Sequence, residues 1–325
     1  MALTLIGLAL AFDFVNGWHD AANSIATVVS TRVLSPKWAV AWAAFFNFAA
    51  FAVFGVAVAN TIAKTIDPHV VTDAVIFGAL FGAIAWDVIT WWFGLPTSSS
   101  HALIGGLVGA GMAKGGWAIV NTDNLYKTMK FIPLAPVIGL VIGLGMMVLI
   151  YWIFRRARPA WANKLFRKGQ LLSAAAYSLG HGANDAQKTM GVLAVILFSH
   201  GHLDSVDHVP LWIVLSAHSA IALGTMSGGW RIVKTMGQKI TKLIPVQGFA
   251  AETGAALTLF GTAHFGIPVS TTHTITGSIV GVGSTQRLSA VRWGIAGRVV
   301  WAWFLTIPAA ALLAALGYHV VNWLT

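Results

Sequence analysis

Long apolar runs separated by short polar stretches extend over the whole chain. At about 20 residues per membrane span, these runs predict ten membrane segments. Five lie in the first half, at 2–30, 38–60, 73–93, 96–113 and 133–154, and five in the second, at 171–199, 210–227, 246–265, 267–285 and 294–321. The first run has neither a basic region before it nor a small-residue cleavage site, so we interpret it as a membrane segment rather than a signal peptide.

The composition supports this interpretation and narrows the class of protein. Apolar residues make up 57% of the 325 residues and charged residues only 9%, whereas an average soluble domain has about 25% charged residues. This balance excludes a disordered chain, a basic nucleic-acid-binding domain and an ordinary cytosolic enzyme. The chain has no cysteine, which excludes disulfides, thiolate zinc sites and cysteine catalysis. We therefore predict an all-α polytopic membrane protein.

The net charge of +10 is explained by membrane topology. If the N-terminus is outside, the loops 31–37, 155–170, 228–245 and 286–293 lie inside, and with the inner end of the last span they hold 15 of the 20 basic residues. The loops on the other side hold 4. The positive-inside rule then places both termini outside. A surface that attracts phosphate is the alternative interpretation of the same charge.

Three sequence features recur in the same order in the two halves. Two pairs of acidic residues, Asp20 with Asp185 and Asp87 with Glu252, are each 165 residues apart, and Pro96 and Pro268 are 172 apart. We explain the difference by one insertion of seven residues between Glu252 and Pro268. Each half has five crossings, an odd number, so the second half must enter the membrane from the opposite side. This predicts an inverted-topology repeat, an architecture common among secondary transporters.

The repeat divides the chain into two halves. We predict a first repeat at 1–154, a basic cytoplasmic linker at 155–170 and a second repeat at 171–325. Within the second repeat, 228–245 has apolar residues at roughly helical spacing together with four basic residues, which predicts an amphipathic cytoplasmic helix on the inner membrane surface. Its apolar positions are Ile232, Val233, Met236, Ile240 and Leu243.

Five ionisable residues lie inside apolar spans: Asp20, Asp87, Asp185, Glu252 and Lys188. Such groups cost several kcal/mol in hydrocarbon, so they must face partners or a water-filled cavity. We interpret the acids as functional, with structural ion pairs as the alternative. Asp13 lies near the outer end of its segment, and we interpret it as structural.

The segments around Asp20 and Asp185 have a helix-breaking composition. VNGWHDAANS and LGHGANDAQKT mix Gly, Asn, His and Asp within apolar helices, which predicts broken or re-entrant helices at the midplane, where unwound backbone lines a cavity. These segments supply carboxylate and amide oxygens, the ligands that hard cations prefer. The same carboxylates can instead carry a proton. The candidate ligands for a coupling ion are Asp20, Asn23, Asn184, Asp185 and Gln187, and, as buried acids, Asp87 and Glu252.

Each half also has a proline followed by a cluster of serine and threonine. GLPTSSSH contains Ser98, Ser99 and Ser100, and GIPVSTTH contains Ser270, Thr271 and Thr272. Proline favours the first helical turn and Ser/Thr favour the N-cap, so a helix is predicted to begin at each cluster. Free N–H groups and the positive end of the helix dipole then point into the membrane interior and form an anion site. The alternative is that the hydroxyls only cap and pack.

Together these motifs resemble the signatures of the inorganic phosphate transporter (PiT) family. GWHDAANSIAT, HGANDAQKTMG, GLPTSSSHALIGG and GIPVSTTHTITGS occur in order over nearly the whole chain. The resemblance implies a phosphate symporter with an inverted-repeat fold that forms a homodimer. It places phosphate near Asp20, Ser98, Ser99, Asp185, Ser270 and Thr271, and cations near Asp20, Asn23, Asn184 and Asp185.

The second motif departs from the first at several positions, among them Asn184 where the first copy has His19. Gln187 and Lys188 stand where the first copy has Ala22 and Asn23. Lys188 can act as a fixed positive charge in place of a cation, contact phosphate directly, or form a salt bridge with Asp185 or Glu252, and we favour the salt bridge. The titratable groups near the site favour a proton over sodium as the coupling ion, and both remain candidates. No other cofactor is predicted.

We therefore predict a secondary active phosphate transporter of the inner cell membrane that works by alternating access, and not an enzyme. A passive anion channel is one alternative. An intramembrane hydrolase is another, because Ser98 and His101 share a helix face. The predicted partners are phosphate, free or as a metal complex, membrane lipid and a second copy of the chain, without nucleic acid. The loop 200–208 has three histidines and two aspartates but no tight metal spacing, so no metal site is predicted.

Overall fold

A computed structural model describes residues 1–324. They form helices and connecting loops, with one isolated backbone bridge between Ile66 and Val120. Twelve α-helices run through these residues: α1 Ala2–Ser30, α2 Pro36–Ala49, α3 Ala57–Ala63, α4 Asp73–Phe93, α5 Ser99–Gly115, α6 Thr122–Phe154, α7 Pro159–Ser199, α8 Leu211–Ser227, α9 Trp230–Lys234, α10 Pro245–His264, α11 Thr271–Ser284 and α12 Trp293–Leu324. Short 3₁₀ turns lie at Ala50–Ala52, Pro68–Val70, Gly116–Ile119 and Leu288–Ala290, and a π-helical turn at Thr235–Lys239.

The helices confirm the prediction of an all-α polytopic membrane protein. Each of the ten predicted segments falls on a helix or on a bent pair of helices. Within the described residues, five helical segments are long and apolar enough to cross a membrane, or seven if the bent pairs around α2–α3 (87°) and α8–α9 (61°) each count as one span. The long helices α6 and α12 expose large apolar side chains such as Trp152 and Trp301, as lipid-facing helices do.

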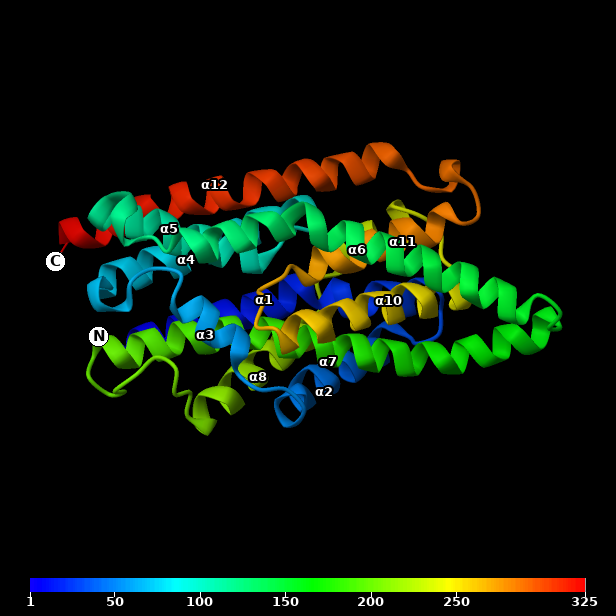
Figure 1. The fold of residues 1–325 in the computed structure, drawn as a ribbon, viewed down its shortest axis with the longest axis horizontal. Coiled ribbons are helices and arrows are strands. Elements are labelled where there is room, and N and C mark those ends of the chain that lie inside the picture. Colours follow the sequence, from blue (N-terminus) through cyan, green and yellow to red (C-terminus); the bar gives the residue numbers. More distant parts are fainter. Residues whose placement is uncertain (325) are drawn as a thin grey trace.

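Corresponding helices of the two halves run in opposite directions along the long axis of the molecule (Figure 1). Helix α1 begins at the end that carries the N-terminus, whereas α7 ends there, and α6 and α12 are likewise antiparallel (Figure 1). This is the arrangement that an inverted repeat requires. Both termini lie at the same end of the molecule (Figure 1).

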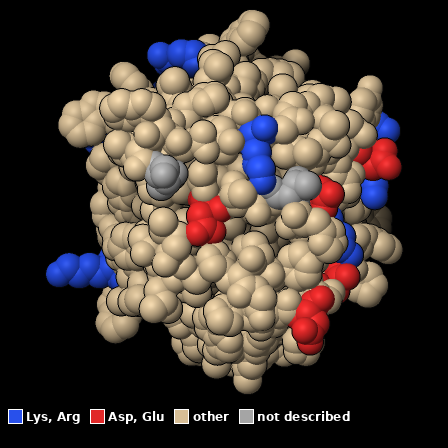
Figure 2. Space-filling model, turned by 90° about the vertical axis from the view of Figure 1, so that its left-hand side faces the viewer, with Lys and Arg blue, Asp and Glu red and all other residues tan. Residues whose placement is uncertain are grey.

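Charged side chains are distributed unequally between the two ends. Figure 2 looks onto the end that carries the termini, where a few acidic and basic side chains lie scattered over a largely uncharged surface. The loops at the opposite end follow α1, α6 and α11 (Figure 1), and they hold basic residues such as Arg32, Arg155 and Arg292. The predicted asymmetry of charge therefore has a structural counterpart.

The helix ends correct one detail of the predicted repeat. Helices α4 and α10 begin 172 residues apart, at Asp73 and Pro245, and both are followed by a glycine in the left-handed conformation with φ of 64°, Gly94 and Gly266. The same offset relates α5 and α11. The insertion therefore lies before α10, not between Glu252 and Pro268. At this offset Asp87 corresponds to Leu259 and Glu252 to Leu80, so the two acids are not repeat partners.

The prediction of helix breaks at Asp20 and Asp185 is wrong. Helices α1 and α7 are continuous through both residues. Their glycines permit close packing instead, because a Cβ atom on Gly17 would lie 2.2 Å from the carbonyl oxygen of Ile221, and one on Gly182 would lie 2.4 Å from that of Asn47. The broken helices are the bent pairs around α2–α3 and α8–α9.

Two further boundaries differ from the sequence prediction. Most of the predicted linker at 155–170 is helical, because α7 begins at Pro159. The segment 228–245 forms α9 and the π-helical turn, but its apolar residues do not face a membrane surface. Ile232, Met236 and Ile240 are buried in the protein at 1% exposure or less, where they pack with residues of α1, α2 and α10.

Apolar packing is divided into two hydrophobic clusters. One includes the start of α1 and the end of α7, with Leu5, Phe12 and Leu193 among its members. The other includes the end of α1 and most of α10 and α11, with Ile25 and Leu259 among its members. In α1 and α7, the buried polar residues around Asp20 and Asp185 lie in sequence between these two sets, and in α5 and α11 buried polar residues form the first turn. A polar layer therefore lies between the two apolar ones.

Candidate functional site

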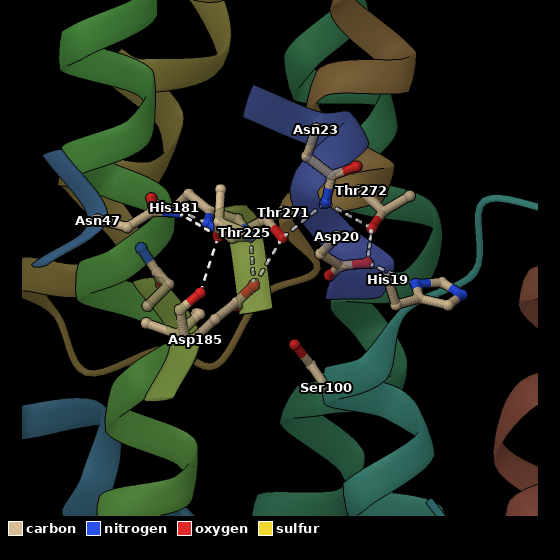
Figure 3. Close-up of polar contacts among 12 residues, drawn as sticks. His19, Asp20, Asn23, Asn47, Ser100, His181, Asp185, Thr225, Thr271 and Thr272 are labelled. Carbon is tan, nitrogen blue, oxygen red and sulfur yellow. Dashed lines mark hydrogen bonds and ion pairs between the residues drawn. The ribbon is translucent and has the colours of Figure 1, made fainter. Parts of the chain in front are cut away.

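The polar layer brings together parts of both repeats. Helices α1 and α7 supply Asp20 and Asp185, and α5 and α11 supply the two hydroxyl clusters at their first turns. Figure 3 shows the two carboxylates approaching each other from facing helices, with Thr271 between them and Ser100 pointing toward the same space. Asp20 and Asp185 are 2% and 0% exposed, so the site is closed to solvent.

Both carboxylate oxygens of Asp185 contact side chains of the protein. Its Oδ1 accepts a hydrogen bond from the ammonium group of Lys188. Its Oδ2 lies 3.1 Å from Nε2 of His181 and accepts from the hydroxyl of Thr271 at 3.0 Å (Figure 3). Of the alternatives for Lys188, the salt bridge with Asp185 is the one formed, and Glu252 takes no part. A buried carboxylate with a lysine and further donors has the partners that burial of charge requires.

Asp20, the repeat partner of Asp185, has weaker partners. Its Oδ1 lies 2.8 Å from Nδ1 of His19 and accepts from Thr272 at 3.4 Å. Within residues 1–324, Oδ2 makes no hydrogen bond or ion pair, and no lysine or arginine contacts this carboxylate. Asn23, one turn further along, donates to Thr272 at 2.9 Å and to Thr271 at 3.3 Å. The carboxylate of the first half therefore lacks the cation that its counterpart has.

Helices α5 and α11 begin inside the protein, as the sequence predicted. Ser98 and Ser270 are their N-caps, and each hydroxyl accepts the backbone N–H of the histidine three residues later, at 3.2 and 3.1 Å. The rings of His101 and His273 meet with centroids 4.8 Å apart, so the two helix starts face each other. At 17 and 14 residues, the helices are about 25 and 21 Å long, shorter than the roughly 30 Å of a bilayer core.

The first turns of these helices form a donor surface. Backbone N–H groups in the first turn have no partner within the helix, and those of Ser99, Ser100, Thr271 and Thr272 belong to this class. The hydroxyl of Ser99 makes no hydrogen bond among the described residues. Together with the positive ends of two helix dipoles, these groups can hold an oxyanion.

Asp87 lies in the same layer, beside the hydroxyl of Ser99 at the start of α5. It is 0% exposed, and neither carboxylate oxygen makes a close hydrogen bond among the described residues. It stands one turn before Thr90, whose hydroxyl lies 3.1 Å from Nε2 of His19. This chain of contacts connects α4 to the carboxylate of Asp20.

Three predicted coupling-ion ligands lie in other environments. Glu252 accepts hydrogen bonds from Thr27 (2.5 Å), Gln170 (3.0 Å) and Ser173 (2.5 Å), in a cluster of its own. The side-chain oxygen of Gln187 accepts the backbone N–H groups of Val58 (2.8 Å) and Ala59 (3.3 Å), so it caps the start of α3. Asn184 donates to the carbonyls of Gly180 (2.9 Å) and Leu259 (3.2 Å), and its own oxygen has no partner in the described chain.

Several buried polar residues near the site were missed from the sequence. Nδ1 of His181 lies 3.1 Å from the side-chain oxygen of Asn47, and the side-chain amide nitrogen of Asn47 donates to the hydroxyl of Thr225 at 2.9 Å. Asp13, interpreted as structural, is fully buried beside Thr189 and Asn16. Asn47 and Asp13 each interrupt an apolar run, and this signal was given weight only for the acids nearer the middle of a span.

The oxygens and nitrogens at the centre can also surround a cation. Ligand atoms of Asp20, His181 and Asp185 lie within 4.8 Å of one another, and no other such group of three occurs in the described part of the chain. In the loop 200–208, His200 and Asp207 contact Asp73 and Lys64 respectively. The loop thus forms no group of three ligands within residues 1–324.

The structure argues against the alternative that Ser98 and His101 form the active site of an intramembrane hydrolase. The hydroxyl oxygen of Ser98 is occupied by the backbone N–H of His101, and neither ring nitrogen of His101 has a partner among the described residues. A nucleophilic serine requires a hydrogen bond to its base. The pair therefore lacks the contact that would activate the serine.

The fold and this buried polar layer define a polytopic membrane protein of the transporter class, with a closed site between two antiparallel halves. The sequence comparison identifies the kind of transporter. Residues 16–314 match the model of the phosphate transporter family, and the chain belongs to that family. The predicted family is thereby confirmed, together with the prediction that the protein is not an enzyme.

Individual relatives agree with this assignment. A probable low-affinity inorganic phosphate transporter of Rhizobium meliloti (strain 1021) is 60% identical over 98% of this chain and 96% of its own length. One of Bacillus subtilis (strain 168) with the same description is 42% identical over 99% and 97%. A solved structure described as the sodium-dependent phosphate transporter matches with a TM-score of 0.88 and 25% identity, covering 100% of this chain and 99% of that one.

Proposed function

We propose that the protein is a symporter that carries inorganic phosphate across the inner cell membrane, driven by a proton or sodium gradient, by alternating access. Both termini lie outside in this proposal, and the basic end faces the cytoplasm. The observation that carries it is the meeting of two helix starts, at Ser99 and Thr271, beside two buried carboxylates, Asp20 and Asp185.

The hydroxyl clusters and the carboxylates complement the two kinds of oxygen in phosphate. Backbone N–H and hydroxyl groups of Ser99, Ser100, Thr271 and Thr272 can donate to its unprotonated oxygens. At neutral pH phosphate also carries at least one O–H group, which can donate to a carboxylate of Asp20 or Asp185. Ser98 and Ser270 position these donors as N-caps.

The charge of the site explains why phosphate needs a cation. Asp20, Asp87 and Asp185 are all buried, and among residues 1–324 only Asp185 of these three has a lysine partner. An anion entering this environment is repelled unless a proton or a metal cation enters with it. Gradient-coupled symport follows from this requirement, whereas a passive anion channel would need a site without excess negative charge.

Closure of the site supports alternating access. Asp20, Asp185, Ser99 and Thr271 are all 2% exposed or less, so neither side of the membrane reaches them in this conformation. Release of phosphate then requires one part of the protein to move against the other. The description of the solved relative as sodium-dependent supports sodium as the coupling ion, while the buried His19 and His181 beside the carboxylates support a proton.

Uptake of radiolabelled phosphate into proteoliposomes tests the proposal. We expect uptake above that of empty liposomes under an imposed sodium or proton gradient, and the effective gradient identifies the coupling ion. Thr271→Val should remove most of this uptake, because Thr271 donates to Asp185 at the centre of the site. Thr306→Val is the matched control, since Thr306 is equally buried but bonds only within its own helix. No uptake under either gradient would refute symport.

A further inference from the structure

The two repeats hold their central carboxylates with side chains of different charge. Asn23 and Lys188 occupy equivalent positions, three residues after Asp20 and Asp185. Ser100 and Thr272 are equivalent as well, each two residues after its N-cap serine. Asn23 donates to Thr272 at 2.9 Å, and Lys188 donates to Ser100. The same contact is thus made twice, once by a neutral amide and once by an ammonium group.

The surroundings of the ammonium group are those of a bound monovalent cation. Nζ of Lys188 contacts a carboxylate oxygen of Asp185, the hydroxyl of Ser100 and, at 3.1 Å, the backbone carbonyl of Val269. These three oxygens use all three N–H donors of the lysine. Lys188 is 0% exposed, so water does not compete for this position. Carboxylate, hydroxyl and carbonyl oxygens are also the ligands of hard metal cations.

The equivalent position in the first half has oxygens of the same kinds but no ammonium group. The carboxylate of Asp20 and the hydroxyl of Thr272 correspond to those of Asp185 and Ser100. Oδ2 of Asp20 has no hydrogen-bonding partner in the described chain, and the side-chain oxygen of Asn23 is buried without one. A lysine ammonium group is built into the second half, whereas the first half has only the imidazole of His19 and the hydroxyl of Thr272 beside its carboxylate.

We propose that the Lys188 ammonium group permanently occupies one of two repeat-related cation positions, so that only the position at Asp20 takes a coupling cation. This inference rests on the proposed symport function and goes beyond it by setting the number of cations. In this proposal, the number of cations carried with each phosphate is one lower than it would be in the same protein with asparagine at position 188. Lys188 has this effect by holding Asp185 neutralised, without contacting the cation that moves.

The substitution Lys188→Asn tests this inference, because it gives the second half the residue that the first half has. Binding of inorganic phosphate to the purified protein is measured by calorimetry over a series of sodium concentrations at fixed pH, and over a pH series without sodium. The slope of log affinity against log cation concentration counts the cations bound with phosphate. We expect this slope, for the cation that drives uptake, to be one unit higher in the variant. A tenfold rise in cation then strengthens phosphate binding by an additional factor of about ten relative to wild type.

Lys130→Asn is the matched control, because it removes an exposed lysine of α6 by the same substitution. Its slope should equal that of the wild type. An unchanged slope in Lys188→Asn would overturn the inference. Loss of phosphate binding at every cation concentration, in a variant that still unfolds cooperatively, would also overturn it, because it would make Lys188 a direct phosphate ligand.

A double substitution keeps the inference testable if Lys188→Asn does not fold. Asn23→Lys combined with Lys188→Asn moves the ammonium group to the equivalent position beside Asp20. We expect the swapped protein to bind phosphate with the slope of the wild type, now through a cation at Asp185. A folded swapped protein with a different slope would contradict the equivalence of the two positions. Failure of the proposed function is distinct, because it would be seen as no phosphate uptake by the wild type.

Discussion

The half-sites around Asp20 and Asp185 have related backbones but different charges. Each places a carboxylate on a continuous helix, beside the start of a short helix capped by serine. The second half neutralises its carboxylate with Lys188, whereas the first contacts it only with His19 and Thr272. The comparison shows that the two halves can keep the same helix geometry while only one of them has a lysine beside its central carboxylate.

Glu252 shows where the symmetry ends. Its three donors, from α1 and α7, satisfy both of its oxygens, while the equivalent position in the first half is Leu80, buried in an apolar cluster. Asp87 has the opposite character, because it is buried with only the hydroxyl of Ser99 beside it and makes no close hydrogen bond among residues 1–324. The acids outside the central pair therefore belong to one half each and contribute no second copy of a site.

The largest expected difference between the half-sites is in stability. Asp185→Asn leaves the buried ammonium of Lys188 without its counter-ion, which should cost about 3–5 kcal/mol of unfolding free energy. Asp20→Asn leaves no lysine or arginine unpaired, and its amide oxygen can still accept from His19 and Thr272, so the change should stay within about 1 kcal/mol. Thermal unfolding in detergent measures both, and equal losses of stability would contradict the asymmetry. Gradient-driven uptake should be lost in both variants.

We expect the two halves to be alike in helix packing, although they differ in the charge beside their carboxylates. Gly17 and Gly182 are repeat partners that each press against a backbone carbonyl of a neighbouring helix, at Ile221 and Asn47. Alanine at either position should destabilise the protein by a similar amount, about 1–3 kcal/mol. Gly7→Ala is the control, because a Cβ there meets nothing within 4 Å. Unfolding curves that show a large loss for only one of the two glycines would mean that the packing of the halves has diverged as well.

The smallest effect concerns Gln187, which the sequence suggested as a cation ligand. Its contacts with Val58 and Ala59 predict that Gln187→Ala removes a helix cap at a cost of about 0.5–2 kcal/mol. Its repeat partner is already alanine, Ala22. We expect the cation dependence of phosphate uptake to be unchanged in this variant. If phosphate uptake by this variant depended less steeply on cation concentration, Gln187 would be a ligand of the coupling cation after all.

The sequence predicted the site where local patterns determine structure. The proline-led clusters at Pro96 and Pro268 marked two helix starts, because capping is a property of a few neighbouring residues. The offset between Asp20 and Asp185 pairs α1 with α7, which run in opposite directions (Figure 1). The pairing of Asp87 with Glu252 failed, because two acids at one offset say nothing about helix register, which the ends of α4 and α10 determine.

Contacts between distant segments could not be derived from such patterns. The glycines around Asp20 and Asp185 suggested broken helices, but only the approach of α2 and α8 shows that they serve close packing. The amphipathic pattern of 228–245 was correct, yet its apolar residues pack into the protein rather than on lipid. Asn47 was missed because a single polar residue in an apolar run acquires meaning only from its neighbours in space.

Counting the cations that bind together with phosphate tests the central claim most directly. Calorimetric titration of purified wild type and Asp20→Asn with inorganic phosphate, over a series of concentrations of the cation that drives uptake, gives the slope for each protein. The account predicts a slope one unit lower in Asp20→Asn, with phosphate still bound at high concentration by the starts of α5 and α11. Equal slopes in the two proteins would show that Asp20 does not hold the coupling cation.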